Sequence, residues 1–502
     1  MLRWPVHILS KTNVLFWTAL SGLIAYVLHI LIGFNFQYTD MDQVLMWYGA
    51  SEFRSGDFHM VRYFGQNYGT MLEGLLGSLL IGIPYHIALP IVTCSLLLLP
   101  YALIGKTSTH NWKWLLPVGF LLLFPPEFFM LGSMPRDFVT GIALTSLALP
   151  LLNRRTKWSY FFIGFICILG WSIQQNAALF GAVVSVYAVW KNDRICWKGV
   201  IWVGLGYAMG AMIHVLVSQY YTMHDEFIVH HAWDFHYAWK QVWDGWKNLD
   251  RHFAWITPAA QYQGWFYILI FSALLIWTYL KKAWPLFFAA VALAVITFAS
   301  FGVLKIHDAR DNVFFSHERM FLALPVAILF IVSRIKTTLP ISQIFAIIGL
   351  ILLPFSFYNF DSILAFNLNE ERDHVVKVRS ADQFYSDCEQ LQDIALKYDV
   401  PLMIFGPNYG MFDVVSTHGC QSVVDDLMLL FPDYERKTWE MRKVVDQNVQ
   451  RFIWHITGDV KLDNRMINIS VETGVEGLYL VQLTEGNAID FFKSKGHSVR
   501  NY

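Results

Sequence analysis

Long apolar runs recur through residues 1–358, and they limit the folds open to this 502-residue chain more than any other feature. A helix needs roughly 17–25 apolar residues to cross about 30 Å of hydrocarbon. About eleven runs come near that length, and they lie at 13–34, 84–104, 115–131, 138–152, 158–174, 176–190, 199–219, 263–280, 284–303, 319–334 and 340–358. Charged residues make up 15% of the chain, against about 25% in ordinary soluble domains. The sequence therefore predicts a polytopic α-helical membrane protein with about eleven transmembrane helices.

Charged residues in the connections between these runs predict how the chain crosses the membrane. Every second connection is rich in lysine and arginine, and the positive-inside rule assigns such connections to the cytoplasm. The bases are Arg3, Lys11, Lys106, Lys113, Arg154, Arg155, Lys157, Lys191, Arg194, Lys198, Lys281, Lys282, Arg334 and Lys336, with Asp193 among them. The alternate connections hold the acids Asp40, Asp42, Glu52, Asp57, Glu73, Asp137, Asp225, Glu226, Asp308, Asp311 and Glu318. This pattern predicts a cytoplasmic N-terminus and puts residues 359–502 on the outer side.

The composition changes after residue 358, where the apolar runs stop and acidic residues become frequent. Apolar spacing and turn signals predict both helices and strands in this tail. The predicted elements are a helix at 381–398, strands at 401–405 and 477–483, and a last helix at 485–494. We therefore divide the chain into a membrane domain, 1–358, and a soluble α/β domain, 359–502, which is long enough to bury its own core.

The five cysteines do not form the pattern of a disulfide scaffold. Cys94, Cys167 and Cys196 lie in or beside apolar runs, where cysteine packs as a small apolar residue. Cys388 and Cys420 lie in the tail. An oxidising compartment would allow these two to form a disulfide, and otherwise they remain free thiols.

The first outer loop, residues 35–83, carries the strongest signs of chemistry. Connections of this length are usually functional. Asp40 and Asp42 stand where the chain leaves the first run, and a carboxylate there can accept a proton from an attacking hydroxyl. The alternative is that both are solvated loop charges. Val44, Trp47 and Tyr48 are spaced for a helix lying along the membrane surface.

Four short motifs stand at outer ends of the predicted membrane helices. The first runs from Asp42 through Ala50 to Ser55-Gly56-Asp57, and the second is Gly65-Gln66-Asn67-Tyr68-Gly69-Thr70-Met71-Leu72-Glu73. The third is the turn Pro135-Arg136-Asp137-Phe138, and the fourth runs from Arg319 to Pro325. In these places residues 1–335 resemble the GT-C superfamily of glycosyltransferases, in particular the bacterial branch related to protein O-mannosyltransferases and lipid A aminoarabinose transferases. Met320 stands where the family has tyrosine, so the fourth match is partial.

The resemblance implies an enzyme of the bacterial inner membrane with a periplasmic active site. Its donor would be a polyprenyl-phosphate sugar, and its acceptor a lipid, a glycan or a protein. The resemblance implies that Asp42, or Asp40 if the alignment shifts, acts as the catalytic base in an inverting transfer. The departing lipid phosphate needs a cation, and arginine binds phosphate with two donors. Arg319 is the first candidate and Arg310 the second, with a plain interfacial anchor as the alternative for Arg319.

Further residues of the motifs are candidates for substrate binding. The third-motif acid approaches the catalytic acid in members of the superfamily, sometimes with a metal, so a divalent cation stays open and no other cofactor is predicted. An Arg–Asp pair of structural function explains that turn equally well. Residues of the first loop either orient the loop or contact the sugar. The substrate-binding candidates are Arg62, Gln66, Tyr68, Glu73, Arg136 and Asp137.

Two other polar segments have competing interpretations. Residues 221–262 hold His224, His230, His231, His236 and His252, which suit either a metal site or, with the accompanying tryptophans, an interfacial helix or lid. Ser172, Gln174, Gln175 and Asn176 form either a sugar-contacting cluster or an outer turn.

Other functional classes fit the sequence less well. A phosphate-binding loop and a dinucleotide motif are absent, and no basic stripe suggests nucleic acid. A lipid-linked glycan flippase would need charged residues within its spans, and an O-antigen polymerase or ligase is usually marked by a large late outer loop. These remain the alternative functions.

Overall fold

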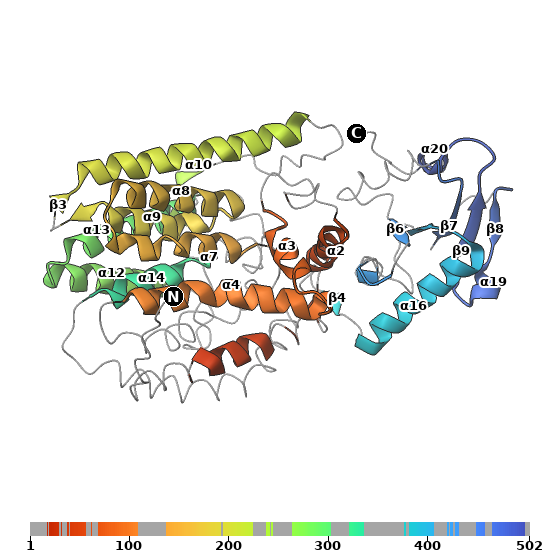
Figure 1. Cartoon of the computed structure of the whole chain (residues 1–502), viewed down its shortest axis with the longest axis horizontal. Helices are drawn as coiled ribbons and strands as arrows, with labels where there is room; N and C mark the ends of the chain where they lie inside the picture. The colour runs from red at the N-terminus through yellow and green to blue at the C-terminus, as the bar shows by residue number, and fades with distance from the viewer. Residues whose placement is uncertain are drawn as a thin grey trace, which may run out of the picture. The chain divides into compact units, whose positions relative to one another are not determined.

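The computed structural model covers residues 1–502, and placement is described for part of them. The described residues are 18, 20–29, 32, 38–39, 41–56, 62, 69–108, 137–191, 194–223, 237–240, 242–243, 264–302, 321–335, 376–377, 381–405, 419–420, 422–424, 427–430, 448–456 and 464–496. The described part is mainly helical with a small mixed sheet (Figure 1).

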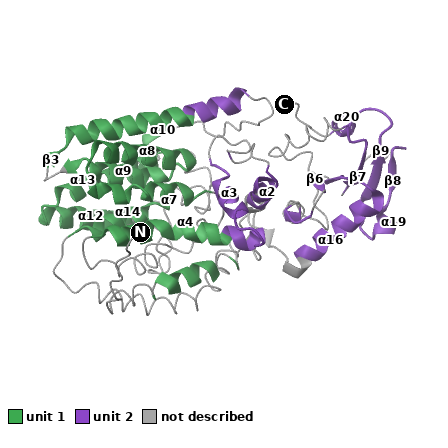
Figure 2. Ribbon diagram, in the orientation of Figure 1, with its two compact units in different colours: residues 1–32, 90–214, 233–372 green, residues 33–89, 215–232, 373–502 purple. Residues whose placement is uncertain are grey.

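The chain divides into two compact units (Figure 2). Unit 1 comprises residues 1–32, 90–214 and 233–372. Unit 2 comprises residues 33–89, 215–232 and 373–502, so the first outer loop groups with the tail. The predicted domain boundary at 358/359 lies outside the described residues.

Unit 1 is a helical bundle whose helices follow the predicted apolar runs. Its helices with described bounds are Leu20–His29, most of α4 (Tyr85–Thr107), α7 (Thr140–Ser146), the 3-10 helix η2 (Leu149–Asn153), α8 (Lys157–Ile173), α9 (Ala177–Ala188), most of α10 (Trp197–Met223), α12 (Gly264–Leu280), α13 (Trp284–Ser300) and α14 (Leu324–Ser333). Residues 85–89 of α4 and 215–223 of α10 belong to unit 2. The helix α9 packs against α7, α8, α13 and α14. Two short strands, β2 (Trp190–Lys191) and β3 (Arg194–Ile195), pair between α9 and α10. The runs predicted at 115–131 and 340–358 lie outside the described residues.

Close helix contacts in unit 1 depend on glycine. A Cβ atom on Gly141 of α7 would lie 2.5 Å from the carbonyl oxygen of Gly170 in α8. A Cβ on Gly206 of α10 would collide with the carbonyl oxygen of Phe161 in α8. Small residues that let backbones approach in this way are typical of helix packing in membranes.

Two described helices are long and apolar enough to cross a bilayer. They are α4, with 23 residues, and α10, with 27 residues. The other apolar helices are shorter. Large apolar side chains of α10 are exposed, including Ile201, Leu205, Met212 and Leu216. These side chains form an exposed apolar stripe along α10.

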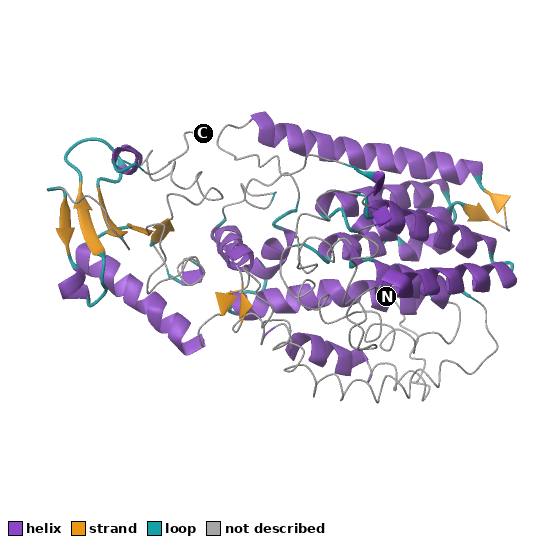
Figure 3. Cartoon of the chain, turned by 180° about the vertical axis from the view of Figure 1, so that it is seen from behind, coloured by secondary structure: helices purple, strands orange, loops and turns teal. Residues whose placement is uncertain are grey.

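Unit 2 combines helices of the first loop with the α/β tail. Its helices are α2 (Met41–Ser55), α3 (Leu72–Ser78), α16 (Ala381–Tyr398), α19 (Ser470–Thr473) and α20 (Ala488–Ser494). Its main sheet contains β5 (Leu402–Phe405), β6 (Met428–Leu430), β7 (Arg451–His455), β8 (Met466–Asn468) and β9 (Leu478–Gln482), in the order β6-β5-β7-β9-β8. Figure 3 shows the described strands in orange and the helices in purple. The first three strands in that order are parallel and the last two pairings are antiparallel. A separate pair joins β1 (Tyr38–Thr39) to β4 (Val376–Lys377).

The predicted secondary structure of the tail is confirmed. The helix at 381–398 has the predicted bounds, and both predicted strands and the last helix are present. Cys388 and Cys420 form a disulfide bond, so the first of the two alternatives for these cysteines holds.

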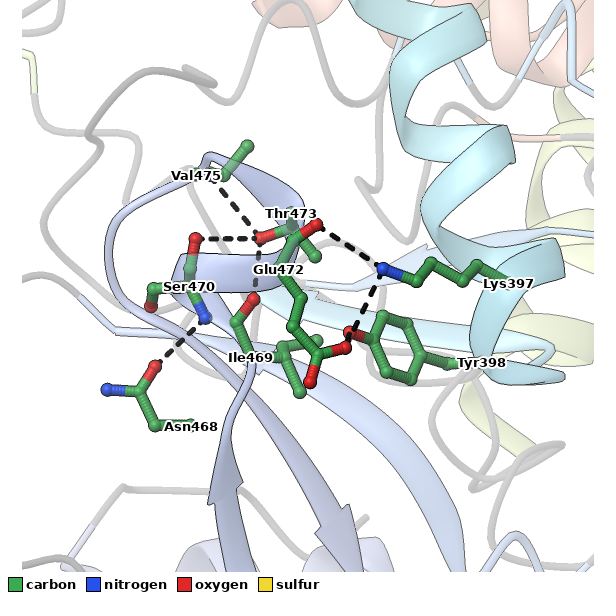
Figure 4. A network of polar contacts seen from close by, with 8 residues as sticks. All are labelled: Lys397, Tyr398, Asn468, Ile469, Ser470, Glu472, Thr473 and Val475. Carbon is green, nitrogen blue, oxygen red and sulfur yellow. Dashed lines mark hydrogen bonds and ion pairs between the residues drawn. The ribbon is translucent and has the colours of Figure 1, made fainter.

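A polar network ties the end of α16 to α19 (Figure 4). The Tyr398 hydroxyl donates to Glu472 Oε2 at 2.7 Å, and Lys397 Nζ lies 3.6 Å from the same oxygen. Asn468 Oδ1 accepts a hydrogen bond from the backbone N–H of Ser470, which begins α19. These contacts fasten the edge of the sheet to the helix that covers it.

Candidate functional site

The helix α2 carries the first candidate base. Asp42 is its second residue, while the Asp42 side chain and all of Asp40 lie outside what the structure describes. An acidic residue in the first turn of a helix is favoured by the helix dipole. The helix ends at Ser55, and Gly56 has a φ of 93°, a conformation that glycine adopts readily. This turn is the described part of the predicted Ser-Gly-Asp motif.

The middle of α2 is buried in the core that supports the tail. Leu45, Met46, Trp47 and Tyr48 are each at most 4% exposed and belong to one cluster with residues of α16 and the sheet. The prediction that Trp47 and Tyr48 lie along a membrane surface is therefore wrong. Aromatic residues three and four positions beyond Val44 suit a protein core as well as a lipid interface, and here α16 provides the apolar partner.

Trp47 stands at the centre of an aromatic cluster in unit 2. Its ring lies edge-on to Phe384 at 6.2 Å and to His86 at 6.4 Å between centroids. Tyr385 and His86 form a hydrogen bond of 3.1 Å between the Tyr385 hydroxyl and His86 Nδ1. A Cβ on Gly419 would lie 2.7 Å from the Phe384 ring and 3.6 Å from Trp47. The disulfide that follows at Cys420 therefore fastens this segment to α16 beside Trp47.

The second motif continues the same core through α3. Gly69 has a φ of 76°, and Glu73 in the first turn of α3 is fully buried. A Cβ on Gly74 would lie 3.1 Å from Met46 Sδ and 3.3 Å from its carbonyl oxygen, so α2 and α3 are in close contact. Of the two interpretations of Glu73, orienting the loop suits this burial better than contact with a sugar.

Arg54 fastens the end of α2 to the segment after α3. Its Nη2 donates to the carbonyl oxygen of Leu80 at 3.1 Å and its Nε to that of Ser78 at 3.4 Å. The guanidinium carbon lies 4.5 Å from the centre of the Tyr85 ring. These contacts hold the two helices of the loop together at their C-terminal ends.

Arg62 is a buried cation of the first loop. It is 5% exposed, its Nη2 donates to Ser218 Oγ at 2.7 Å, and its backbone N–H donates to the Tyr221 hydroxyl at 2.8 Å. Burial lowers the pKa of the Arg62 guanidinium, because a low-dielectric surrounding disfavours the charged form. These contacts hold the loop against the last turns of α10 within unit 2.

The third motif forms a tight turn in unit 1. Asp137 is fully buried with a φ of 64°, which is uncommon for any residue except glycine, asparagine and aspartate. Its carbonyl oxygen accepts from the Thr140 N–H at 3.1 Å. Asn176 Nδ2 donates to the carbonyl oxygen of Phe138 at 2.8 Å. Asn176 from the predicted polar cluster therefore supports the Asp137 turn, a link that the sequence analysis missed.

A small gap between helices of unit 1 lies near this turn. It has room for about one water-sized group. Its walls come from α4, the start of α7 and the chain around the start of α14. The lining residues are Leu96, Leu97, Pro100, Tyr101, Val139, Ile142, Leu322 and Val326. A gap of this size is ordinary helix packing and is too small to bind a substrate.

The remaining candidates lie outside the described residues. They are Gln66, Tyr68, Arg136, Arg310 and Arg319, together with the histidines at 224, 230, 231, 236 and 252. Among the residues that are described, no three His, Cys, Asp or Glu side chains cluster as metal ligands. Of the described candidates, Asp42, Arg62 and Glu73 belong to unit 2 and Asp137 to unit 1.

No known protein-family model matches the chain, and no curated protein matches its sequence.

Proposed function

We propose that this chain is a polytopic membrane glycosyltransferase of the GT-C type. It transfers a sugar from a polyprenyl-phosphate donor to a lipid, glycan or protein acceptor on the periplasmic face of a bacterial inner membrane. The observation that carries the proposal is the close contact of α2 with α3. This contact joins two motifs of the first loop, because Asp42 lies in the first turn of α2 and Glu73 in the first turn of α3.

Two features of unit 1 support a membrane location. The lengths and hydropathies of α4 and α10 suit a bilayer, and at about 1.5 Å per residue the 27 residues of α10 are long enough to cross it. Charged residues of the described unit 1 helices lie in their end turns, as Lys106, Lys157 and Lys198 illustrate. A transporter would be expected to hold charges within its spans, so this distribution favours chemistry at the membrane surface.

The disulfide supports an outer location for the tail. Disulfides persist in oxidising compartments and are rare in the reducing cytosol. Cys388 and Cys420 are both buried in the core shared with α2. The first loop and the tail would then face the same, periplasmic side, in agreement with the acids that gather in the outer connections.

The proposed reaction needs a base and a cation. Asp42 takes the proton of the acceptor hydroxyl as its oxygen attacks the anomeric carbon. The bond from that carbon to the phosphate oxygen breaks, the carbon inverts, and the lipid phosphate leaves with an added negative charge. Arg319, or Arg310 in its place, stabilises that charge with paired hydrogen-bond donors.

The proposal is tested with the purified full chain in detergent. The substrates are a mixture of polyprenyl-phosphate monosaccharides and a total extract of cell-envelope lipids and glycans. We expect release of free polyprenyl phosphate that depends on the extract, and we expect Asp42→Asn to reduce it by about 100-fold or more. Asp40→Asn is the matched variant two residues away, and it should retain turnover if Asp42 is the base.

The outcomes separate the base from the reaction class. No extract-dependent release by the unaltered chain contradicts the transferase proposal. If Asp42→Asn releases polyprenyl phosphate normally and Asp40→Asn does not, Asp40 is the base. Normal release by both variants contradicts the assignment of the base to Asp42 or Asp40.

A further inference from the structure

One end of the unit 1 bundle holds almost all of its described charge. The described bases there are Lys106, Arg154, Arg155, Lys157, Lys191, Arg194, Lys198, Lys281, Lys282 and Arg334. Helix connections place them together, because each lies where α4, η2, α8, α9, α10, α12, α13 or α14 begins or ends. Among the described residues of unit 1 the one acid is Asp137. Asp137 lies before α7, and the chain then runs through α7 and η2 to Arg154, so Asp137 is at the other end of the bundle from these bases. Along the chain one acid, Asp193, stands among these bases, so the basic end carries a large excess of positive charge.

Arg334 is the base that the surrounding helices hold most closely. It follows α14, and its Nη2 donates to Thr107 Oγ1 at the end of α4, at 3.2 Å. Its guanidinium carbon lies 5.1 Å from the centre of the Tyr187 ring in α9 and 4.9 Å from that of Phe330. Ser108 Oγ donates to the carbonyl oxygen of Ser333 at 3.0 Å, which ties α4 to α14 beside it. The ends of three helices thus converge on one guanidinium.

The Arg334 guanidinium keeps hydrogen-bonding capacity that the protein does not use. The residue is only partly exposed, whereas Lys106, Arg154, Arg155 and Lys281 are exposed. Its Nε atom is buried, and among the described residues it has no hydrogen-bond partner. Aromatic faces stabilise a cation, but leaving a buried donor unsatisfied is unfavourable. Because Nε is buried, a ligand with paired acceptor oxygens would approach the two Nη groups, where one hydrogen bond, from Nη2 to Thr107, joins the guanidinium to the described residues.

We infer that Arg334 is the centre of an anion site that binds a phosphate group at the basic end of unit 1. Phosphate oxygens match the arginine fork, and the neighbouring bases attract negative charge. The phosphate belongs either to the headgroup of an anionic membrane lipid or to a soluble phosphate compound. This site lies at the opposite end of the bundle from the Asp137 turn, and the inference does not depend on the proposed sugar transfer.

The test measures phosphate binding by the purified full chain in neutral detergent with native mass spectrometry and thermal unfolding. One arm adds phosphatidylglycerol, with phosphatidylcholine as its neutral counterpart, and the other adds inorganic phosphate. We expect phosphatidylglycerol or phosphate to bind, and Arg334→Gln to weaken that binding about tenfold, the usual effect of losing a charge-assisted hydrogen bond. Lys281→Gln removes one exposed base from the same end and should change binding less than twofold.

A second variant guards against loss of folding in Arg334→Gln. Arg334→Lys keeps the positive charge beside the rings but loses the planar fork, so it should fold and still bind several-fold more weakly. Selective binding of phosphatidylglycerol identifies the ligand as a lipid headgroup. If inorganic phosphate raises the thermal unfolding temperature as much as phosphatidylglycerol does, the ligand is a soluble phosphate compound. Equal weakening by Lys281→Gln, unchanged binding in Arg334→Lys, or no binding by the unaltered chain would overturn the site and leave Arg334 as a helix-end cap.

Discussion

Replacing Trp47 with alanine tests whether the first loop and the tail share one core. Trp47 is 3% exposed and contacts Phe384 of α16 and His86 of α4. Truncating a buried tryptophan to alanine typically costs about 3–5 kcal/mol in unfolding free energy, through lost apolar contact and the cavity that remains. The loss should fall on α2 and on the tail together, because the residue packs against both.

The assay is pulse proteolysis of the detergent-solubilised chain across a series of urea concentrations. One antibody to the C-terminal end follows the tail, and mass spectrometry of the released peptides follows the first loop. At a urea dependence of about 2 kcal/mol per molar, the expected loss lowers the unfolding midpoint of the tail by about 1.5–2.5 M. Trp197→Ala provides the matched control, because Trp197 begins α10 and is 71% exposed. Its midpoint should remain within about 0.3 M of the unaltered protein.

The reasoning is refuted if the tail of Trp47→Ala unfolds at the same urea concentration as that of the Trp197→Ala protein. That result would mean that the tail gains its stability without α2. A lowered midpoint restricted to fragments of the first loop would also contradict a common core. A coincident shift of both parts supports it.

Two further predictions concern the tail. Replacing both Cys388 and Cys420 with serine removes a cross-link between residues 32 apart. This change should lower the unfolding free energy of the tail by about 2–4 kcal/mol, which the same urea assay measures. An unfolding midpoint equal to that of the unaltered chain, with and without reductant, would contradict the prediction. The hydrogen bond from Tyr398, followed by the charge of Lys397, lowers the pKa of the exposed Glu472 carboxyl. A carboxyl with a lowered pKa in the folded state stabilises the fold above its unfolded pKa, about 4.3, and that stabilisation disappears as pH falls through the folded pKa. We therefore expect Glu472→Gln to remove a small part of the acid-induced loss of stability, while Glu485→Gln, at an exposed position, leaves it unchanged; identical pH profiles for the two variants would refute the role of Glu472.

Local patterns in the sequence predicted most of the described elements. Apolar runs of helical length correspond to α4, α8, α9, α10, α12 and α13, because hydrophobicity along a helix is a local property. The 381–398 helix was predicted at its observed bounds from apolar residues at helical spacing. The strand that ends before Gly406 and the strand at Leu478–Gln482 followed from short apolar segments bounded by turn residues.

The candidate site was predictable only as a set of residue types. The resemblance of short motifs suggested Asp42 and Asp137, and Arg62 and Glu73 were candidates as charged residues of the first loop. The burial of Glu73 against α2 and the anchoring of Arg62 by Tyr221 could not be predicted in this way. Each depends on side chains that are distant along the chain.

The sequence by itself determined that this chain is rich in apolar helices, that its charges are sorted between alternate connections, and that an α/β tail follows. Only the tertiary structure decided which distant segments pack together. Trp47 could face lipid or protein by its local pattern, and its burial depends on the shape that α16 and the segment at Gly419 offer it. By its local sequence Asn176 could be a surface turn residue, but in the structure it donates a hydrogen bond to the carbonyl oxygen of Phe138 and supports the Asp137 turn. Local periodicity specifies which face of a helix is apolar, but complementary shape between remote segments specifies what that face contacts.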